Sequence, residues 1–355
     1  MSSDPLLQGN GMQVESGLTS SWKGWLKILL LALALALSIR AFCIQAFRIP
    51  TPSMEKTLLV GDFVLVSKLH YGPRGPLTFG LPLTDWYVHS WHFPFVRFPG
   101  FRAVERGDVI VFNYPVETGP IDRKLHYIKR VIGLPGETLT IHDKRPVLDG
   151  TAIPLTSGMQ QKWVVKGRDG FRFPRNKLLD AGAEQVTTLR RAEAQYAFEA
   201  TEAVANEIAS WAETVVVRPY ILNAHPDHQL HTFPEGRGYG RDQYGPLYIP
   251  AKGDTLRLSP ETWSAYKTLI NRYEGHRAHL LPNGEFEIDD LVTSQYVVAQ
   301  NYYFVLGDNR DSSADSRVWG FVPEDHIVGK AVMVYFSWDE GKRKPRFERM
   351  FTSVQ

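Results

Sequence analysis

The organisation of the chain is decided by WLKILLLALALALSIRAFCIQAF, residues Trp25–Phe47. Its centre, Ile28–Ile39, carries no charge. As a single helix the segment would be roughly 34 Å long, which is enough to cross a bilayer. Lys27 and Arg40 lie near its ends, where long basic side chains can reach the lipid headgroups. We therefore predict a transmembrane anchor over residues 23–47, preceded by a loose polar tail.

A cleaved secretory signal is the alternative interpretation of this segment. Lys23 would then belong to its basic start and Ile28–Ile39 to its apolar part. However, the bulky Phe42 precedes Cys43, so a lipoprotein cleavage site is absent. Arg40 or Phe42 also falls where an ordinary cleavage site needs small residues, which favours an uncleaved anchor. Basic residues flank both ends, so charge alone does not set the orientation.

The composition of the 355 residues limits the classes of protein to consider. A chain that is 43% hydrophobic and 22% charged is neither disordered nor a polytopic transporter. Lys+Arg 40 against Asp+Glu 38 gives a net charge of +2, so nothing in the charge points to nucleic acid. The single cysteine excludes an intramolecular disulfide framework.

After the anchor, short runs of β-branched and aromatic residues alternate with turn signals. Several of these runs follow a Gly-Asp pair, in which glycine permits a tight turn and aspartate can bond back to the backbone. The sequence therefore predicts a mainly β protein behind the anchor. The predicted strands are Phe63–Val66, Val109–Phe112, Tyr127–Ile132, Tyr302–Leu306 and Ala331–Phe336.

Residues 150–295 have a different pattern. Apolar positions at helical spacing predict a helix within Glu184–Glu213. A second helix should begin at Ser259, with Pro260 at its first position. We interpret this segment as an α+β domain inserted into the β fold, which leaves 48–149 and 296–355 for the β domain.

Thr78–Arg102 is rich in phenylalanine and tryptophan, interleaved with prolines. Such a segment cannot be a spanning helix. It is either a loop that covers the core or an interfacial membrane contact, where aromatic rings are favoured. Its closeness to the anchor in sequence favours the contact.

Three strings could carry chemistry. The first is FRIPTPSMEKTL, Phe47–Leu58, in which Pro50 and Pro52 are expected to hold the chain extended around Ser53. The six residues after Phe47 reach about 21 Å at most, so Ser53 should lie near the membrane surface.

The second string is YIKRVIGLPGE, Tyr127–Glu137. In a strand, Lys129 and Arg130 point to opposite faces, so one of them faces the core if either face is buried. A buried lysine lowers its pKa and becomes an amine that can accept a proton, whereas arginine cannot respond in this way. An exposed lysine on an edge strand is the ordinary alternative.

The third string is GDNRDSSADSRVWGFVPE, Gly307–Glu324. Asp308, Asp311 and Asp315 suggest a calcium loop, but the required spacing is missing and two arginines would oppose a cation. A polar loop held by Asp–Arg pairs is the better interpretation.

Together with RGDVIVFNYP, Arg106–Pro115, these strings resemble the type I signal peptidases, the bacterial leader peptidase family of membrane-anchored serine proteases. The resemblance runs from the end of the anchor through about Phe336, and residues 150–295 are unmatched by motif. Two positions depart from the family pattern: Lys56, where many members carry proline, and Pro52, where a small residue is common.

The resemblance implies that Ser53 is the nucleophile and Lys129 the general base of a Ser–Lys dyad. It implies an oxyanion hole formed by the Ser53 backbone N–H and the Thr51 hydroxyl. Supporting roles fall to Ser313, which would orient the Lys129 amine, to the Asp315–Arg317 pair, and to Gly307, which would allow close backbone approach. The substrate strand would lie beside Phe47, Ile49, Pro50, Met54, Leu58, Tyr127 and Ile128.

The resemblance also implies a substrate and a location. The substrates would be signal peptides of exported preproteins, cut at small-x-small sites, with no metal or cofactor required. The protein would cross the bacterial inner membrane once, with residues 1–22 cytoplasmic and the catalytic domain on the periplasmic face. Membrane lipid and a secretion translocase would be neighbours, and nucleic acid would not be a partner.

Two other functions fit a membrane-anchored chain of this kind. A Ser–His hydrolase would use His126 or another histidine in place of Lys129. A binding or assembly factor would keep the fold without catalysis, but Ser53, Lys129 and Ser313 are all present, which argues against a decayed site.

Overall fold

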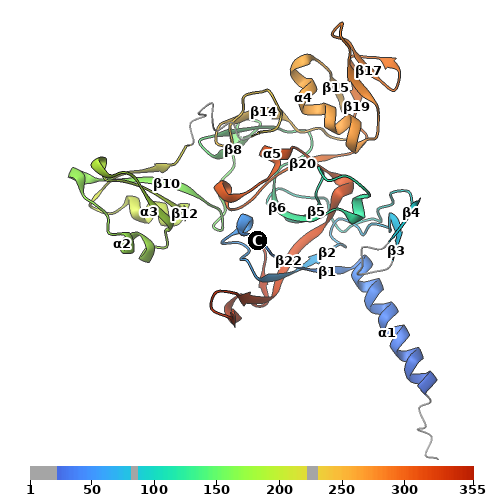
Figure 1. Cartoon of the computed structure of the whole chain (residues 1–355), viewed down its shortest axis with the longest axis horizontal. Coiled ribbons are helices and arrows are strands. Elements are labelled where there is room, and N and C mark those ends of the chain that lie inside the picture. The colour runs from blue at the N-terminus through green and yellow to red at the C-terminus, as the bar shows by residue number, and fades with distance from the viewer. Residues whose placement is uncertain (1–21, 81–86, 222–230) are drawn as a thin grey trace, which may run out of the picture.

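The computed structural model describes residues 22–80, 87–221 and 231–355 of the chain. Its largest sheet is antiparallel and runs in the order β1-β2-β22-β5-β6-β20-β21, with β23 and β24 also paired to β22. Figure 1 shows this sheet at the centre of the molecule, with α1 projecting away from it. The predicted class, a mainly β protein with an N-terminal apolar helix, is confirmed. The strands are β1 (Ile44–Arg48), β2 (Asp62–Ser67), β5 (Val109–Asn113), β6 (His126–Gly133), β20 (Tyr302–Leu306), β21 (Val322–Pro323), β22 (Ile327–Asp339), β23 (Lys344–Pro345) and β24 (Thr352–Ser353).

The anchor helix α1 spans Trp22–Phe42, and none of its residues is buried. Its 21 residues are apolar enough to cross a membrane. The prediction that the helix continues to Phe47 is wrong, because Ile44–Arg48 forms strand β1 and pairs with β2. Sheet pairing here outweighs the apolar composition of the segment. Residues 1–21 of the predicted tail lie outside the described residues.

The predicted Gly-Asp turns are confirmed. Gly61, Gly107 and Gly253 have φ of +91°, +88° and +88°, a backbone conformation that glycine adopts without steric cost. In each turn the aspartate side chain accepts the backbone N–H three residues before it, as Asp62 does from Leu59 at 2.8 Å. These turns fix where β2, β5 and a further strand, β15 (Thr255–Arg257), begin.

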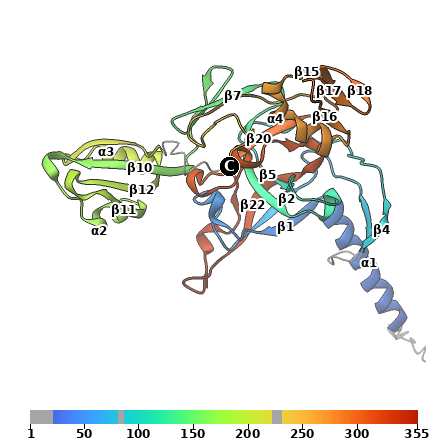
Figure 2. The same cartoon turned by 45° about the horizontal axis from the view of Figure 1, so that its top comes forward.

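A separate four-stranded sheet, in the order β11-β12-β10-β13, forms a lobe that lies away from α1 (Figure 2). The helix predicted within Glu184–Glu213 is wrong over most of its length, since only Glu202–Ala209 is α-helical and most of the rest forms β11 and β12. Residues at helical spacing also alternate well enough for strands, and β12 pairs with β10 along its whole length. The lobe contains β10 (Gln160–Gly167), β11 (Glu184–Arg190), β12 (Gln195–Thr201), β13 (Thr214–Pro219), α2 (Arg175–Asp180) and α3 (Glu202–Ala209).

The remaining elements pack over one end of the main sheet. Helix α4 (Pro260–Thr268) begins as predicted, with Ser259 capping it and Pro260 in its first turn. The division of the chain at residues 150 and 295 stays a prediction, although β14 pairs across it with β7. These strands are β7 (Thr138–His142), β8 (Arg145–Leu148), β9 (Thr151–Ala152), β14 (Tyr244–Tyr248), β15 (Thr255–Arg257), β16 (Ala278–Leu280), β17 (Phe286–Ile288), β18 (Leu291–Val292) and β19 (Gln295–Val297).

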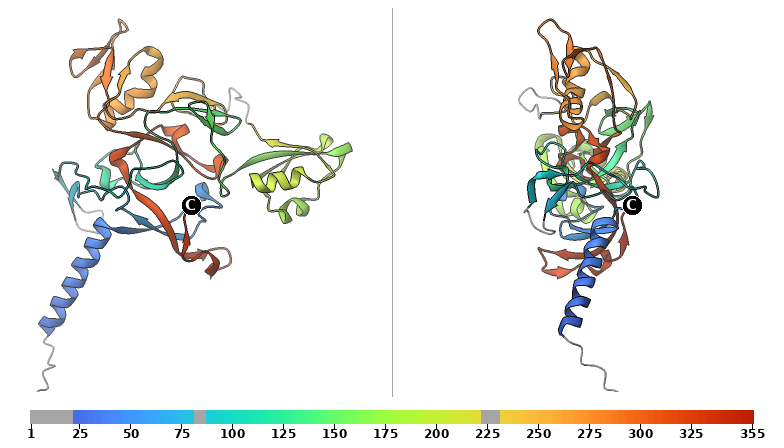
Figure 3. Two further views of the ribbon diagram at one scale, coloured as in Figure 1. Left: turned by 180° about the vertical axis from the view of Figure 1, so that it is seen from behind. Right: turned by 90° about the vertical axis from the view of Figure 1, so that its right-hand side faces the viewer.

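The aromatic segment after β2 forms a two-stranded ribbon of β3 (Thr78–Gly80) and β4 (Tyr87–His92), close to the end of α1 (Figure 3). Several rings that follow it are exposed, with Phe93 at 45% and Phe101 at 80%. Phe98 makes an edge-on contact with Phe42 of α1, with ring centroids 6.2 Å apart. The segment therefore contacts the anchor, while Arg97 within it donates to the Glu324 and Ile327 carbonyls of the main domain at 3.0 and 2.7 Å. Residues 81–86 are outside the described part of the chain.

Candidate active site

Ser53 lies in a single helical turn, Pro52–Met54, that follows strand β1. Thr51 is extended, with φ −129° and ψ 153°, as the flanking prolines predict. The expectation of extended backbone around Ser53 itself is wrong, because the fixed φ of Pro52 also suits the first position of a helical turn. The turn leaves Ser53 with 8% of its surface exposed.

Strand β6 brings Lys129 to this serine from 76 residues further along the chain. Its Nζ lies 2.7 Å from Ser53 Oγ and 2.9 Å from the Ile128 carbonyl oxygen. The residue is 4% exposed. Burial lowers the pKa of Lys129 to about 8, although Asp315 and Asp308 act in the opposite direction. With this pKa about a tenth of the amine is neutral at pH 7, and it contacts the hydroxyl whose proton it could accept.

Thr51 and Gly307 border the serine on two sides. Thr51 Oγ1 is 3.5 Å from Ser53 Oγ, so its hydroxyl is placed to interact with charge that develops beside the serine. At Gly307 an added Cβ would stand 2.5 Å from the Ser53 carbonyl oxygen and 2.2 Å from Ser313 Oγ. No side chain fits there, so only glycine lets the 307–315 loop approach Ser53 this closely.

Three side chains were expected to support Lys129: Ser313, Asp315 and Arg317. The Asp315 and Arg317 side chains are ion-paired at 2.8 Å, and both residues are buried. Burial raises the pKa of Asp315, but the Arg317 charge and further hydrogen bonds, among them one from the Gly307 N–H, bring it below its usual value. Ser313 Oγ also helps to lower that pKa, but it has no hydrogen bond of normal geometry among the described residues, to Lys129 or to any other group.

Two further residues of this loop were not assigned a role from the sequence. Asp308, which is 0% exposed, accepts two hydrogen bonds from the Arg130 guanidinium, at 2.8 and 2.6 Å. Asn309 donates its backbone N–H to the Ser53 carbonyl at 3.1 Å and its side-chain amide to the Pro52 carbonyl at 3.2 Å. The sequence held a signal for Asp308, because a buried Arg130 next to Lys129 needs a carboxylate partner. Within the described residues no group of acidic, histidine or cysteine side chains could hold a metal ion.

Two strand edges near Ser53 are unpaired. In the described part of the chain, β1 pairs only with β2, and β6 pairs with β20 only from Arg130 onwards. Residues 126–129 therefore have one free edge. The rings of Phe47 in β1 and His126 in β6 lie 4.9 Å apart, so these two stretches of strand come close to each other.

The residues that we predicted to contact substrate are divided by this geometry. Pro50 is exposed, while Phe47, Tyr127 and Ile128 are partly exposed. Ile49, Met54 and Leu58 are 2%, 0% and 0% exposed and pack in the core of the sheet. The four exposed or partly exposed residues can therefore meet a substrate directly, whereas the three core residues lie beneath the surface.

Histidine does not take the place of Lys129 in this geometry. Within the described residues, none of the hydrogen bonds of Ser53 Oγ involves a histidine. Burial, followed by the charges of Arg74, Lys68 and Arg40, lowers the pKa of His126 to about 4. Its ring packs on Phe47, and His142 is exposed on β7.

Comparison with known families agrees with this site. The model of the family described as "Signal peptidase, peptidase S26" matches residues 22–203 and 252–338. The chain belongs to this signal peptidase family. The match includes the anchor helix, the Ser53 turn, strand β6 and the 307–315 loop, and the predicted enzyme class, a serine endopeptidase, is confirmed by it.

Individual bacterial members of the signal peptidase family are similar over most of the chain. Signal peptidase I of Pseudomonas fluorescens is 30% identical over 331 residues, which cover 90% of this chain and 74% of the relative. Signal peptidase I of Aquifex aeolicus is 26% identical over 333 residues, which cover 92% and 89%. Signal peptidase I of Haemophilus influenzae is 27% identical over 348 residues, which cover 91% and 73%.

Proposed function

We propose that this protein removes signal peptides from exported preproteins, with Ser53 as nucleophile and Lys129 as general base. The observation that carries the proposal is the 2.7 Å contact between Lys129 Nζ and Ser53 Oγ in a site where the lysine is 4% exposed. Ordinary serine and lysine side chains are unreactive at neutral pH, and this contact addresses both problems at once. Burial favours the neutral amine, and the neutral amine is in place to take the hydroxyl proton.

The reaction follows the Ser–Lys form of acyl transfer. As Ser53 Oγ attacks the scissile carbonyl, its proton passes to Lys129 Nζ and a C–O bond forms. The Ser53 backbone N–H and the Thr51 hydroxyl stabilise the oxyanion. Protonated Lys129 then gives its proton to the leaving amine as the C–N bond breaks. Water, activated by the same amine, hydrolyses the acyl-enzyme and regenerates the serine.

Supporting residues hold this arrangement in place. Gly307 and the Asp315–Arg317 pair fix the loop behind the dyad, and Ser313 would orient the Lys129 amine through a shift of its free hydroxyl. No group that the mechanism uses is a metal or cofactor.

The free edges of β1 and β6 are suited to an extended peptide. A substrate strand can pair with the free edges at 44–48 and 126–129, which gives affinity through the main chain. Its alternate side chains would meet Phe47, Pro50, Tyr127 and Ile128. Ile49, Met54 and Leu58 pack into the core beneath them. Such a surface would accept small residues, as in small-x-small cleavage sites.

We further propose a location in the bacterial inner membrane, with α1 as the single crossing and the catalytic domain on the periplasmic face. A translocase would deliver substrates nearby, and membrane lipid would contact the exposed rings around Phe98. Because α1 ends at Phe42, the connection to Ser53 has eleven residues and can reach about 36 Å, which is longer than the sequence suggested. The position of Ser53 near the surface therefore depends on the folded sheet rather than on a short tether.

The test is cleavage of a preprotein by the purified full chain in detergent or lipid. Ser53→Ala is expected to abolish cleavage at the small-x-small site, while His126→Ala keeps most of it. Loss of activity in His126→Ala with retention in Lys129→Ala would instead identify a Ser–His hydrolase. Full biological complementation by Ser53→Ala would identify a non-enzymatic assembly factor.

A further inference from the structure

A cavity of about 360 Å³ lies where the anchor helix meets the main sheet. Its walls come from the last turns of α1, from Gln45 of β1 and from Lys68, the residue after β2. The end of α1 is also where the membrane surface must lie, since the helix projects from the body of the protein in all views (Figures 1 and 3). The cavity is therefore at the boundary between lipid tails and headgroups.

The lining of the cavity changes from apolar to polar along the helix axis. Leu37 lies on the bilayer side, while Arg40, Gln45 and Lys68 lie on the side of the sheet. Five residues of helix between Leu37 and Phe42 correspond to about 8 Å. A ligand that fits this gradient has an apolar part at one end and a polar part at the other.

The polar end carries two cations, Arg40 and Lys68, and no carboxylate among the described residues acts on Lys68. The Arg40 guanidinium and the Gln45 amide have no hydrogen-bond or ion-pair partner there, whereas Arg48, eight residues beyond Arg40, is ion-paired with Glu340. Lys68 donates to the carbonyls of Arg40 and Ala41 at 2.9 and 3.0 Å, which uses two of its three protons.

The surroundings of Lys68 add further positive charge. Burial, then the charges of Arg74 and Arg40, lower the pKa of Lys68 to about 8, and no carboxylate is among the groups that act on it. A bound anion would offset this repulsion, and the Arg40 fork matches the oxygens of a phosphate.

We propose that this cavity binds one anionic phospholipid, with its phosphate at Arg40, Gln45 and Lys68 and an acyl chain along Leu37. A zwitterionic headgroup fits less well, because its own cation would face Arg40 and Lys68. The inference goes beyond peptide cleavage, and it can fail while the proposed catalytic function stands, because its test measures lipid binding alone.

The experiment is native mass spectrometry of the full chain, released from micelles that contain equal amounts of phosphatidylglycerol and phosphatidylcholine. The wild type should retain one phosphatidylglycerol with a preference of about tenfold over phosphatidylcholine. Arg40→Gln should lose most of that preference, and Arg40→Lys should keep part of it. Arg48→Gln is the matched control, because it removes one cation nearby that is already paired, and it should retain the preference.

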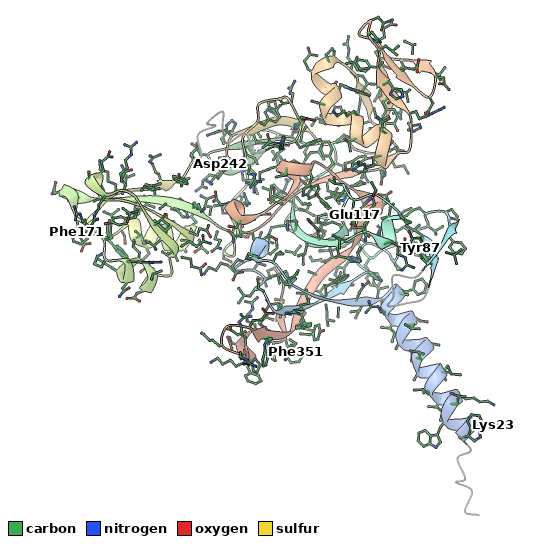
Figure 4. All side chains as sticks on the ribbon, in the orientation of Figure 1. Lys23, Tyr87, Glu117, Phe171, Asp242 and Phe351 are labelled. Atoms are coloured by element: carbon green, nitrogen blue, oxygen red, sulfur yellow. The ribbon has the colours of Figure 1, made fainter. Side chains whose placement is uncertain are left out.

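Three results would overturn the proposal. Equal retention of the two lipids by the wild type would show that the cavity does not select an anion. Equal loss in Arg40→Gln and Arg48→Gln would show a diffuse charge effect in place of a site. Displacement of the lipid by millimolar inorganic phosphate would show that the apolar half of the cavity contributes nothing. A further control is Lys27→Gln, in the first turns of α1, which should leave the preference unchanged. Figure 4 labels Lys23, four residues before it, at the end of α1 far from the sheet.

Discussion

Three lysines are buried among the described residues, and the surroundings of two of them, Lys129 and Lys144, differ in kind. Lys129 on β6 is 4% exposed and contacts a hydroxyl and a carbonyl oxygen. Lys144, at the turn between β7 and β8, is 2% exposed and lies between Asp242, at 3.1 Å, and Asp311. Figure 4 shows Asp242 at the base of the β10–β13 lobe, where this second lysine ties several loops together.

The difference shows how one residue type serves two purposes. Carboxylates beside Lys144 offset the cost of burying an ammonium group, so the charge can hold Asp242 and Asp311 in place. Neutral oxygens beside Lys129 do not offset that cost, so burial lowers its pKa and the proton becomes transferable. The same side chain is therefore structural in one place and chemical in the other. Four measurements on Lys129 and Lys144 test whether the two lysines differ in this way.

The largest expected effect is on catalysis. Lys129→Met should lower kcat/KM for preprotein cleavage by at least about 10⁴-fold, since a serine hydroxyl without its base is nearly inert. Lys144→Met, assayed per folded molecule, should lower it by no more than about tenfold. A Lys129→Met enzyme within a hundredfold of wild type would contradict the assignment of the base.

The next effect is on stability and concerns the paired lysine. Lys144→Met removes the ammonium group that pairs with Asp242 and Asp311, and it should cost about 3–5 kcal/mol of unfolding free energy. Urea denaturation of the full chain in detergent would measure the loss. Lys56→Met is the control, because Lys56 forms an exposed ion pair with Glu184 and should change stability by less than about 1 kcal/mol. Equal losses in the two variants would show that burial of Lys144 does not matter.

The third effect is the pH dependence of cleavage. The pKa of Lys129 is lowered to about 8, and only the neutral amine accepts a proton. The value of kcat/KM should therefore rise about tenfold per pH unit below pH 8, and level off above it. The total change between pH 6 and the plateau above about pH 9 is then about a hundredfold. A rate that stays constant from pH 6 to 10 would mean that another group is the base.

The smallest effect is on the stability of Lys129→Met, and its sign is opposite to that expected for Lys144→Met. The unfolded chain keeps the Lys129 proton up to about pH 10.4, whereas the folded chain releases it at about pH 8, which costs about 3 kcal/mol of stability at pH 7. Lys129→Met removes that cost and loses a hydrogen bond worth about 1 kcal/mol. The variant should be inactive yet about 2 kcal/mol more stable at pH 7.

This gain should fade between about pH 8 and 10, as the unfolded state of the wild type also loses its proton. Denaturation curves of the two chains at pH 7 and pH 10 measure it. A Lys129→Met variant that is less stable than wild type at pH 7 would show that burial of this amine carries no cost.

Local patterns predicted the elements whose cause is local. The Gly-Asp turns and the cap at Ser259 depend on residues within a few positions of one another, and the structure confirms them. The helix expected across β11 and β12 failed, as did the extension of the anchor to Phe47. Both segments are held as strands by partners elsewhere in the chain, which periodicity cannot identify.

The sequence by itself determined that the chain is anchored by one apolar helix and that Ser53, Lys129 and the 307–315 loop are the segments to compare with a protease family. Alternation in β6 indicated that Lys129 and Arg130 point to opposite faces, but not which of them would be buried. The tertiary structure decided that both are, because Asp308 compensates Arg130 while Lys129 has only neutral contacts. Burial, and with it the pKa, is a property of the packed interior, so only the folded chain could make this lysine a base.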